Sequence, residues 1–470
     1  MRINSLHIED YYILQDFDID FSSNLSVLIG ENGSGKSSVL ECLAFIFGHL
    51  HKYFVLDDKT AEFIDGYRID YTINGHNVYI ESKYVSSKTN TFQPIIRIDD
   101  EELSIPQIKK RYGDFKVFLP EKVVLFYSGI TEHLKKLHEH FEDKFIKKII
   151  KQNNPYSLNP LKLPDDNPFM YVKKEYVSFV LLSLFVLDSV ESKAILRTIG
   201  VDIDGCTTTI TLKKPYWAKF DKEDKDDRLW GMTGKIATDF VNGLDYFGIR
   251  NNKADAPEYV FYGSLMIRDL FSSFFNLLPN QVISFMDTLL CDDLLGAVNI
   301  TWGEGISVDK LSEGEKQLIL TVGLGLVLNK QNLLFLYDEP DVSLHPKWQQ
   351  DFISSIIKGL DQESMAIITT HSPILVSNLQ KALVQVIHKG RMLSSNNYSF
   401  GRDINSILED YFKIDERNEE GKILIKSFYD AMGAKDYDKA EELLNKLKAT
   451  FGPEDVSTVK AESLFDDLAE

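Results

Sequence analysis

A glycine-rich stretch between an apolar run and a helix-like segment constrains this chain more than any other feature. The run Leu25–Ile29 suits a strand buried in a parallel sheet, and it ends at Gly30. From there the chain fits the pattern G-x-x-x-x-G-K-[ST], with Gly35, Lys36 and Ser37 at its fixed positions. Strand, glycine-rich turn and helix in this order predict an α/β sheet with a phosphate-binding loop.

The residue types in this loop are those that phosphate binding requires. Glycine lets successive backbone N–H groups turn toward one anion, and the helix start adds the positive end of its dipole. We expect Lys36 to reach the β- and γ-phosphates of a nucleotide and Ser37 Oγ to coordinate Mg²⁺. The alternative is a glycine-rich turn that binds nothing, which the flanking strand and helix disfavour. The residues expected to contact the nucleotide here are Gly30, Asn32, Gly33, Ser34, Gly35, Lys36, Ser37 and Ser38.

Length, cysteine use and charge narrow the class of protein. With 470 residues, 44% of them hydrophobic, the chain can bury a large core and form about two to four domains. Its three cysteines contain no C-x-x-C pair, which predicts neither a disulfide framework nor a zinc site. We see no leader-like segment and no apolar run of about 20 residues, so we expect a cytoplasmic protein without membrane contact. The formal net charge of −19 argues against a surface coated with nucleic-acid-binding groups, without excluding a local basic groove.

Residues 1 to 150 are predicted to form the first part of a nucleotide-binding head. Two strands around Tyr11 and Tyr12 precede the loop, and a helix over residues 36–50 follows it. Hairpin signals around the Asn74-Gly75 turn predict an antiparallel β subdomain beside the nucleotide-binding sheet. Either tyrosine could stack on an adenine, or both could be ordinary strand aromatics.

A helical pattern near the end of this segment carries a lysine stripe. It is the best local candidate for contact with nucleic-acid phosphates, although such a stripe is more often a solvated helix face. Residues 151 to 290 are then predicted to form a mainly helical insertion whose residues show no recognisable chemistry. The lysines of the stripe are Lys144, Lys147, Lys148 and Lys151.

Acidic residues follow a second apolar run, where they can meet the glycine-rich loop. Asp338 and Glu339 stand at the carboxyl end of a predicted strand, the edge where ligands bind in open α/β sheets. Asp338 suits Mg²⁺ coordination together with Ser37, and Glu339 suits polarisation of the attacking water. The next strand leads to His371, which we expect to contact the γ-phosphate. Catalytic roles are therefore expected for Lys36, Glu339 and His371.

The order of these motifs resembles an ABC-class ATPase head. Residues 30–37 match its Walker A motif, Leu311–Gln317 its signature, residues 333–339 its Walker B motif and His371 its switch histidine. The resemblance covers roughly residues 1–130 and 290–410. It implies an α/β fold of the ABC-type P-loop NTPase class, with a mixed sheet, helices on both sides and an antiparallel β subdomain. It also implies ATP and Mg²⁺ as cofactors and hydrolysis of ATP to ADP and phosphate.

In that family two heads pair head to tail around ATP. The resemblance implies that Ser312, Gly314 and Glu315 of one subunit contact the ATP of the other, which makes the protein a homodimer or higher homo-oligomer. Ser312 and Glu315 also form an S-x-x-E capping box, which on its own indicates only a well-capped helix start. His345 stands where many heads carry an aspartate, which is a departure from the family's pattern for communication between the two sites.

Within this class, two segments resemble a bacterial defence and repair branch. Asp338–Pro346 and Phe400–Leu408 are similar to OLD-type nucleases, RecF-like proteins and, most of all, the ATPase subunit of Septu anti-phage systems. The chain shows no nuclease constellation, so the resemblance implies regulation of a separately encoded HNH-type nuclease. The alternative is a RecF/SMC-like, ATP-dependent DNA-binding repair factor without a nuclease partner. The glutamine of the family's Q-loop has no clear counterpart, since Gln93 and Gln107 are poor candidates.

The remaining head residues are expected over 291–415, and a helical tail over 416–470. Two helical patterns, Gly421–Met432 and Asp436–Thr450, stop at Gly452-Pro453, and a short acidic amphipathic end follows. Such a tail could dock the partner nuclease or pack as a lid on its own head.

Overall fold

The computed structural model divides the chain into two compact units, Met1–Gly401 and Arg402–Glu470, which we describe one at a time. The four lysines of the stripe and Gln93 lie outside the residues that the structure describes, so the predictions made for them stay predictions. The described residues are 1–56, 65–82, 94–127, 134, 136, 137, 139, 141, 167–214, 235–251, 256–291, 293–328, 331–393, 399–412 and 417–469.

A seven-stranded mixed sheet forms the centre of the first unit, in the order β18-β17-β3-β16-β15-β8-β9. All its neighbouring strands run parallel except β17 and β18. Each residue of β3, β15 and β16 is buried, as expected for strands covered on both faces. The strands are β3 Leu25–Ile29, β8 Lys122–Phe126, β9 Phe169–Tyr171, β15 Leu333–Asp338, β16 Met365–Thr369, β17 Val384–His388 and β18 Arg391–Leu393.

A second, antiparallel sheet packs on the same core, in the order β2-β1-β4-β5-β6-β7. The predicted hairpin is confirmed, and its turn residues Asn74 and Gly75 have φ values of 51° and 78°. Positive φ at both positions is the geometry that favours an Asn-Gly pair between two strands. Its strands are β1 Arg2–Tyr11, β2 Leu14–Asp20, β4 Asp65–Ile73, β5 His76–Ser82, β6 Ile95–Ile98 and β7 Glu101–Glu102, followed by α2 Ile105–Tyr112 and η1 Phe115–Phe118.

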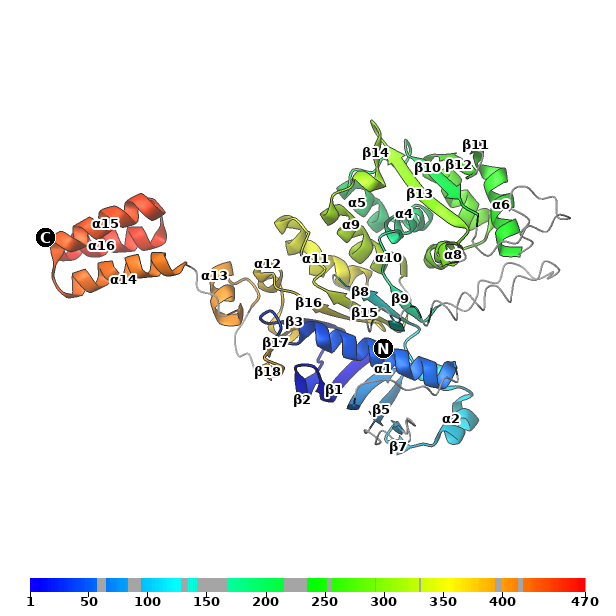
Figure 1. Ribbon diagram of the computed structural model, residues 1–470, viewed down its shortest axis with the longest axis horizontal. Coiled ribbons are helices and arrows are strands. Elements are labelled where there is room, and N and C mark those ends of the chain that lie inside the picture. Colours follow the sequence, from blue (N-terminus) through cyan, green and yellow to red (C-terminus); the bar gives the residue numbers. More distant parts are fainter. Residues whose placement is uncertain are drawn as a thin grey trace. The chain divides into compact units, whose positions relative to one another are not determined.

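Helix α1, Lys36–Val55, extends one turn beyond the predicted end and is buried along most of its length. One hydrophobic cluster joins its side chains to both the parallel and the antiparallel sheet. In Figure 1, α1 lies on one side of β15 and β16, and α11 (Pro346–Gly359) on the other. The expected arrangement of a mixed sheet with helices on both sides and an antiparallel subdomain is therefore confirmed.

Helices dominate the described part of residues 151–290, as predicted, but strands that the sequence did not reveal also lie there. They join two later strands in a five-stranded antiparallel sheet, β11-β12-β10-β13-β14, which crosses the boundary expected at residue 290. The strands are β10 Thr207–Leu212, β11 Ile249–Asn251, β12 Glu258–Tyr262, β13 Leu295–Trp302 and β14 Ile306–Ser307. The helical elements are α4 Tyr176–Leu187, α5 Val190–Thr198, α6 Lys235–Phe247, α7 Gly263–Arg268, η2 Asp269–Phe274 and α8 Pro279–Cys291.

The remaining helices of the first unit include the one that follows Ser312. None of the helices in the described ranges has the length and apolar character to cross a bilayer. The remaining elements are η3 Val308–Lys310, α9 Glu313–Leu318, η4 Ile319–Gly323, α10 Leu324–Leu328, α12 Pro373–Ser377 and η5 Lys381–Leu383.

The second unit starts at Arg402, whereas the sequence predicts a tail from residue 416. The two expected helices are confirmed as α14 (Glu419–Gly433) and α15 (Tyr437–Phe451). The expected short end is a third helix, α16 (Val456–Ala469), whose Ala461 is buried with side chains of the other two. Arg417 Nη2 donates to both carboxylate oxygens of Asp455, just before α16, each at 2.7 Å. The short elements α13 (Ile404–Ile407) and η6 (Leu408–Phe412) complete this unit.

Candidate nucleotide-binding site

The glycine-rich loop joins the end of β3 to the start of α1, as predicted. Gly33 and Gly35 have φ values of 73° and 108°, a region that residues with a side chain rarely adopt. A Cβ on Gly30 would lie 2.1 Å from the carbonyl oxygen of Ile387 in β17. Backbone conformation and close packing therefore each require glycine in this loop.

The N-terminus of α1 is open. Its N-cap residue, Gly35, supplies no side-chain hydrogen bond, and its first turn carries no acidic residue. Within the described residues, the buried Ser34 hydroxyl has no hydrogen-bond partner. A helix N-terminus without a cap, beside an unpaired hydroxyl, fits the phosphate oxygens of a nucleotide.

Lys36 is buried inside this loop. Its Nζ donates to the carbonyl oxygens of Gly30 at 3.2 Å and Glu31 at 3.1 Å. Burial lowers its pKa, while Glu339 and Asp338 raise it. The ammonium is thus held by neutral acceptors that an anion in the loop could replace.

Strand β15 brings Asp338 to the start of α1, across the intervening strand β16. Ser37 Oγ donates to Asp338 Oδ1 at 2.8 Å, and Thr369 Oγ1 donates to the same oxygen at 2.7 Å. Asp338 is buried. The hydroxyl and the carboxylate together offer the oxygen ligands that Mg²⁺ prefers, so the residues fit the expected ion.

Glu339 and His371 meet at the same edge. Their Oε1 and Nε2 atoms are 3.2 Å apart, and each side chain is about one-third exposed. Burial, and then Lys36, lower the His371 pKa against the opposing effect of the acids, so the imidazole is neutral near neutral pH. A neutral Nε2–H can donate to the Glu339 carboxylate and orient it.

Helix α9 begins with the predicted capping box. Glu315 Oε2 accepts from both Ser312 N and Ser312 Oγ at 2.7 Å, and Glu315 N donates to Ser312 Oγ at 3.3 Å. Gly314 is buried, and a Cβ there would lie 2.5 Å from the carbonyl oxygen of Ser343. The contacts expected from Ser312, Gly314 and Glu315 to ATP on a second subunit stay predictions.

Polar contacts that the sequence did not reveal tie α9 to the loop after Glu339. Gln317 Oε1 accepts from Ser343 N at 3.1 Å, and Gln317 Nε2 donates to Glu339 O at 3.4 Å. Nearby, Thr370 Oγ1 donates to Asp341 Oδ2 at 2.8 Å, and burial raises the Asp341 pKa to about 6. No local pattern marks these residues, because each contact joins separate segments of the chain.

The two tyrosines near the loop have different surroundings. The Tyr11 hydroxyl donates to Glu41 Oε2 at 2.8 Å, and the Tyr127 hydroxyl donates to Glu41 Oε1 at 3.0 Å. Tyr12, in the turn between β1 and β2, is 64% exposed, which leaves the prediction of adenine stacking open for this residue. Gln107 bonds to Ser104 N and Oγ at the start of α2, where it acts as part of a helix cap.

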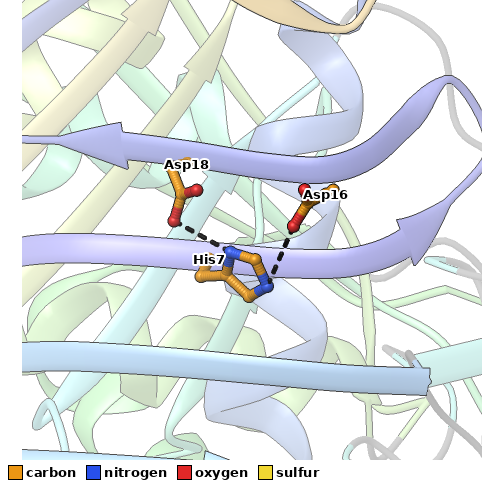
Figure 2. A group of neighbouring side chains, drawn as sticks. All are labelled: His7, Asp16 and Asp18. Atoms are coloured by element: carbon orange, nitrogen blue, oxygen red, sulfur yellow. Dashed lines mark hydrogen bonds and ion pairs between the residues drawn. The ribbon is translucent and has the colours of Figure 1, made fainter.

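A separate histidine group lies on the antiparallel sheet (Figure 2). His7 Nδ1 is 2.8 Å from Asp18 Oδ1, on the residue opposite it in β2, and Nε2 is 3.9 Å from Asp16 Oδ1. Ligand atoms of the three residues lie within 4.8 Å of one another. Because each ring nitrogen already faces a carboxylate, the group is best described as a contact between strands.

The chain matches the family described as "RecF/RecN/SMC N terminal domain" over residues 2–395. It is 23% identical to the Retron Ec83 probable ATPase of Escherichia coli, over 98% of this chain and 86% of that protein. It is 22% identical to the Retron Vc95 probable ATPase of Vibrio cholerae serotype O1 biovar El Tor, over 87% of this chain and 78% of that protein. It is 27% identical to the Septu protein PtuA of Bacillus thuringiensis, over 47% of this chain and 62% of that protein.

These similarities confirm the predicted resemblance to a RecF/SMC-like branch that includes the Septu ATPase, and they add the retron ATPases to it. The glycine-rich loop and the acids at the end of β15 lie inside the matched region. Since that region spans well over half of the chain, the protein belongs to the RecF/RecN/SMC N-terminal domain family and is an SMC/RecF-like ATPase.

Proposed function

We propose that this protein binds ATP with Mg²⁺ and hydrolyses it, and that two copies pair head to tail around the nucleotide. The observation that carries the proposal is the meeting of five polar side chains from three segments of the chain at the carboxyl ends of the parallel strands. These side chains are Lys36, Ser37, Asp338, Glu339 and His371.

Each of these residues has a role that its surroundings support. The open N-terminus of α1 and Lys36 bind the β- and γ-phosphates. Ser37 and Asp338 hold Mg²⁺, which when bound neutralises charge on the phosphate oxygens. Glu339 accepts a proton from the attacking water, and His371 orients Glu339 or turns to the γ-phosphate.

Pairing of two heads supplies the second half of the site. Ser312 is exposed at the start of α9 and can face the ATP of a second subunit. The same helix contacts the loop after Glu339 in its own chain through Gln317. We propose that this contact passes the state of one site to the other.

We further propose that ATP-dependent pairing regulates a separately encoded HNH-type nuclease in anti-phage defence, in the cytoplasm. Similarity to the Septu protein PtuA and to two retron ATPases supports this assignment. The second unit is the proposed docking element, because it forms its own small core and still exposes apolar side chains. These include Ile423, Val456, Val459 and Leu468.

The second candidate is a DNA-binding repair factor without a nuclease partner. The family match, which includes RecF and RecN, favours it. It predicts tight, salt-sensitive, ATP-dependent DNA binding by the chain alone, lost when the lysine stripe is reversed in charge. If the chain, expressed with its neighbouring genes, co-purifies with a stoichiometric nuclease, the first candidate is favoured.

The head-to-tail arrangement can be tested by mixing two inactive variants. Lys36→Ala removes a chain's own phosphate-binding lysine and keeps its signature, whereas Ser312→Arg blocks the signature and keeps the loop. We expect either variant alone to lose ATP-dependent dimerisation and turnover. Because neither variant pairs with itself, the dimers in an equimolar mixture are heterodimers with one intact site of two, so turnover should recover to about half of the parental value.

Turnover and the mass of the complex by sedimentation are both measured. A mixture that recovers neither would overturn the head-to-tail arrangement. Gly314→Ala is a poor substitute for Ser312→Arg, because the added methyl group would collide with Ser343 in the same chain.

A further inference from the structure

We propose that Thr369 is a positioning residue for both acids of the site, because its hydroxyl joins the carboxylate of Asp338 to the backbone of Glu339. The inference rests on the proposed function, since it concerns the Mg²⁺ that Asp338 is proposed to hold and the base that Glu339 is proposed to supply. Thr369 does not belong to the sequence motifs that identify the nucleotide site.

Strand pairing places Thr369 at the centre of the site. It is the last residue of β16, the strand that lies between β3 and β15. Thr369 is opposite Asp338 of β15 on one side and Leu28 of β3 on the other, and it is fully buried. It therefore stands between the strand that leads to the glycine-rich loop and the strand that ends in the acids.

The Thr369 hydroxyl acts as donor to one acid and as acceptor from the other. Its Oγ1 donates to Asp338 Oδ1 at 2.7 Å and accepts from Glu339 N at 3.0 Å. A hydroxyl has one proton and two lone pairs, so these two bonds are compatible and their directions are fixed. A buried hydroxyl that only needed a partner would be satisfied by one acceptor, and here it bonds to both acids.

The bond to Asp338 holds the carboxylate that is proposed to bind the ion. The Oδ1 atom accepts from Ser37 Oγ at 2.8 Å as well as from Thr369, so two hydroxyls limit the rotation of the carboxylate. Outer-shell hydrogen bonds orient metal ligands in this way, and their loss lowers metal affinity or activity by about 10- to 100-fold.

The bond from Glu339 N holds an uncommon backbone conformation. Glu339 has a φ value of 47°, in the left-handed region that residues with a side chain rarely adopt. Its N–H is directed at Thr369 Oγ1 and at the Thr369 carbonyl oxygen, 3.0 and 3.1 Å away. Its carbonyl oxygen accepts from Gln317 Nε2. Because such a conformation persists only where its surroundings fix it, the hydroxyl helps to set the direction of the Glu339 side chain.

Two pairs of side chains at this position isolate the hydroxyl. Thr369→Val replaces it with a methyl group of similar shape, and Thr369→Ser and Thr369→Ala differ from each other only in the hydroxyl. Thr288→Val is the matched control, because the buried Thr288 hydroxyl in α8 donates to the carbonyl oxygen of Ser284 at 2.7 Å. The ATP affinity of each purified full-length variant is measured by calorimetry, with Mg²⁺ and with EDTA, and turnover is measured at saturating ATP and Mg²⁺.

We expect Thr369→Val and Thr369→Ala to reduce the gain in ATP affinity that Mg²⁺ gives by about tenfold, and turnover by about tenfold. Their affinity in EDTA should stay near the parental value, because the bonds of Thr369 go to the acids and not to the glycine-rich loop. Thr369→Ser and Thr288→Val should keep both the parental gain and the parental turnover.

Parental gain and turnover in both Thr369→Val and Thr369→Ala would overturn the inference. Equal losses in Thr369→Ser and Thr369→Ala would also overturn it, since they would trace the effect to packing of the methyl group. Unfolding midpoints are measured in parallel, and the comparison of serine with alanine decides the outcome if Thr369→Val does not fold. Failure of the proposed site itself would show differently, as parental ATP affinity in Lys36→Ala.

Discussion

Two helix N-termini are proposed to contact phosphate in this protein, and their chemistry is opposite. Helix α1 starts at Lys36 after Gly35, with no side-chain cap and no acid in its first turn. Helix α9 starts after Ser312 with a complete capping box, and its first turn holds Glu313 and Glu315. One N-terminus is open and basic, whereas the other is already satisfied and acidic.

This difference indicates an order of events. An open N-terminus with a buried lysine attracts a nucleotide to a single chain, whereas carboxylates at the other N-terminus repel phosphate. We therefore expect ATP to bind α1 first and α9 to engage it only after a second chain approaches. Ser312 must then exchange its bond to Glu315 for one to the nucleotide.

The loop after Glu339 ties the start of α9 to the end of β15 within one chain. Gly314 lies against Ser343, and Gln317 bonds to Ser343 and to Glu339. Movement of α9 on pairing would therefore shift the backbone that carries the proposed base. Substitutions at five residues separate the contributions of α1, α9 and this loop.

Glu339→Gln should give the largest effect. It keeps the shape of the side chain but removes the base, so turnover should fall by about 1,000-fold. ATP binding at α1 should stay within about twofold, and ATP-bound dimers should accumulate. Steady-state phosphate release and sedimentation measure these effects, with Glu304→Gln in the exposed turn between β13 and β14 as the control. Turnover at the parental rate would show that Glu339 is not the base.

Lys36→Ala tests the open helix start directly. The loss of charge-assisted hydrogen bonds to phosphate should lower ATP affinity by about 100-fold, or roughly 3 kcal/mol. Calorimetric titration measures the change. Lys347→Ala, at an exposed lysine in the first turn of α11, should bind ATP like the parent. Unchanged affinity in Lys36→Ala would refute the role of the loop.

Asp341→Asn tests the loop after Glu339 through pH. Burial raises the Asp341 pKa from its ordinary 3.8 to about 6, so the folded state favours the protonated carboxyl. Its stabilising contribution is complete below about pH 4 and is lost as pH rises through 6. Between pH 4 and 7 the parent should lose about 2 to 3 kcal/mol of unfolding free energy relative to Asp341→Asn, which cannot titrate. Denaturant unfolding at the two pH values measures this, and parallel curves would contradict it.

His371→Gln addresses the side chain that faces Glu339. We expect turnover at pH 7.5 to fall about tenfold, as for the loss of one hydrogen bond. Because the His371 pKa is lowered, parental turnover should be insensitive to this histidine above pH 6.5 and should fall below it as the ring is protonated. In the variant, the part of this fall in turnover that comes from protonation of His371 should be absent. An identical pH profile in both proteins would remove His371 from the mechanism.

Substitutions of Ser312 test the capped helix α9, and their expected effect on the free energy of unfolding is the smallest. Ser312→Ala removes the cap of α9 and should cost about 1 kcal/mol of unfolding free energy. Ser312→Asp can still cap the helix but adds a carboxylate where the second subunit's phosphate is expected. It should keep parental stability and lose ATP-dependent pairing, as measured by thermal unfolding and sedimentation. Parental pairing in Ser312→Asp would place the nucleotide elsewhere.

Features that obey local rules could be predicted from the sequence. The strand, loop and helix around Gly35, the acids that end β15 and the capping box at Ser312 each follow from a short pattern, and each is present. The contacts of Tyr127 with Glu41 and of Asp341 with Thr370 follow no such pattern. They join residues 86 and 29 positions apart, so they depend on which strands become neighbours.

Dependence on distant partners also explains why the sequence did not reveal some elements of the fold. Strand β10 alternates buried and partly exposed positions, but its partners β12 and β13 come much later in the chain. Short strands of this kind are stabilised by cross-strand packing more than by their own propensity. Helix α16 is similarly stabilised by burial of Ala461 against α14 and α15.

By itself, the sequence determined the glycine-rich loop, the acidic strand end and the histidine one strand later, because glycine conformation, apolar runs and helix caps act over a few residues. Only the tertiary structure decided that Ser37 meets Asp338, which lies 301 residues away. That meeting requires β3 and β15 to flank β16 in one parallel sheet, and the order of strands is set by the packing of the whole core.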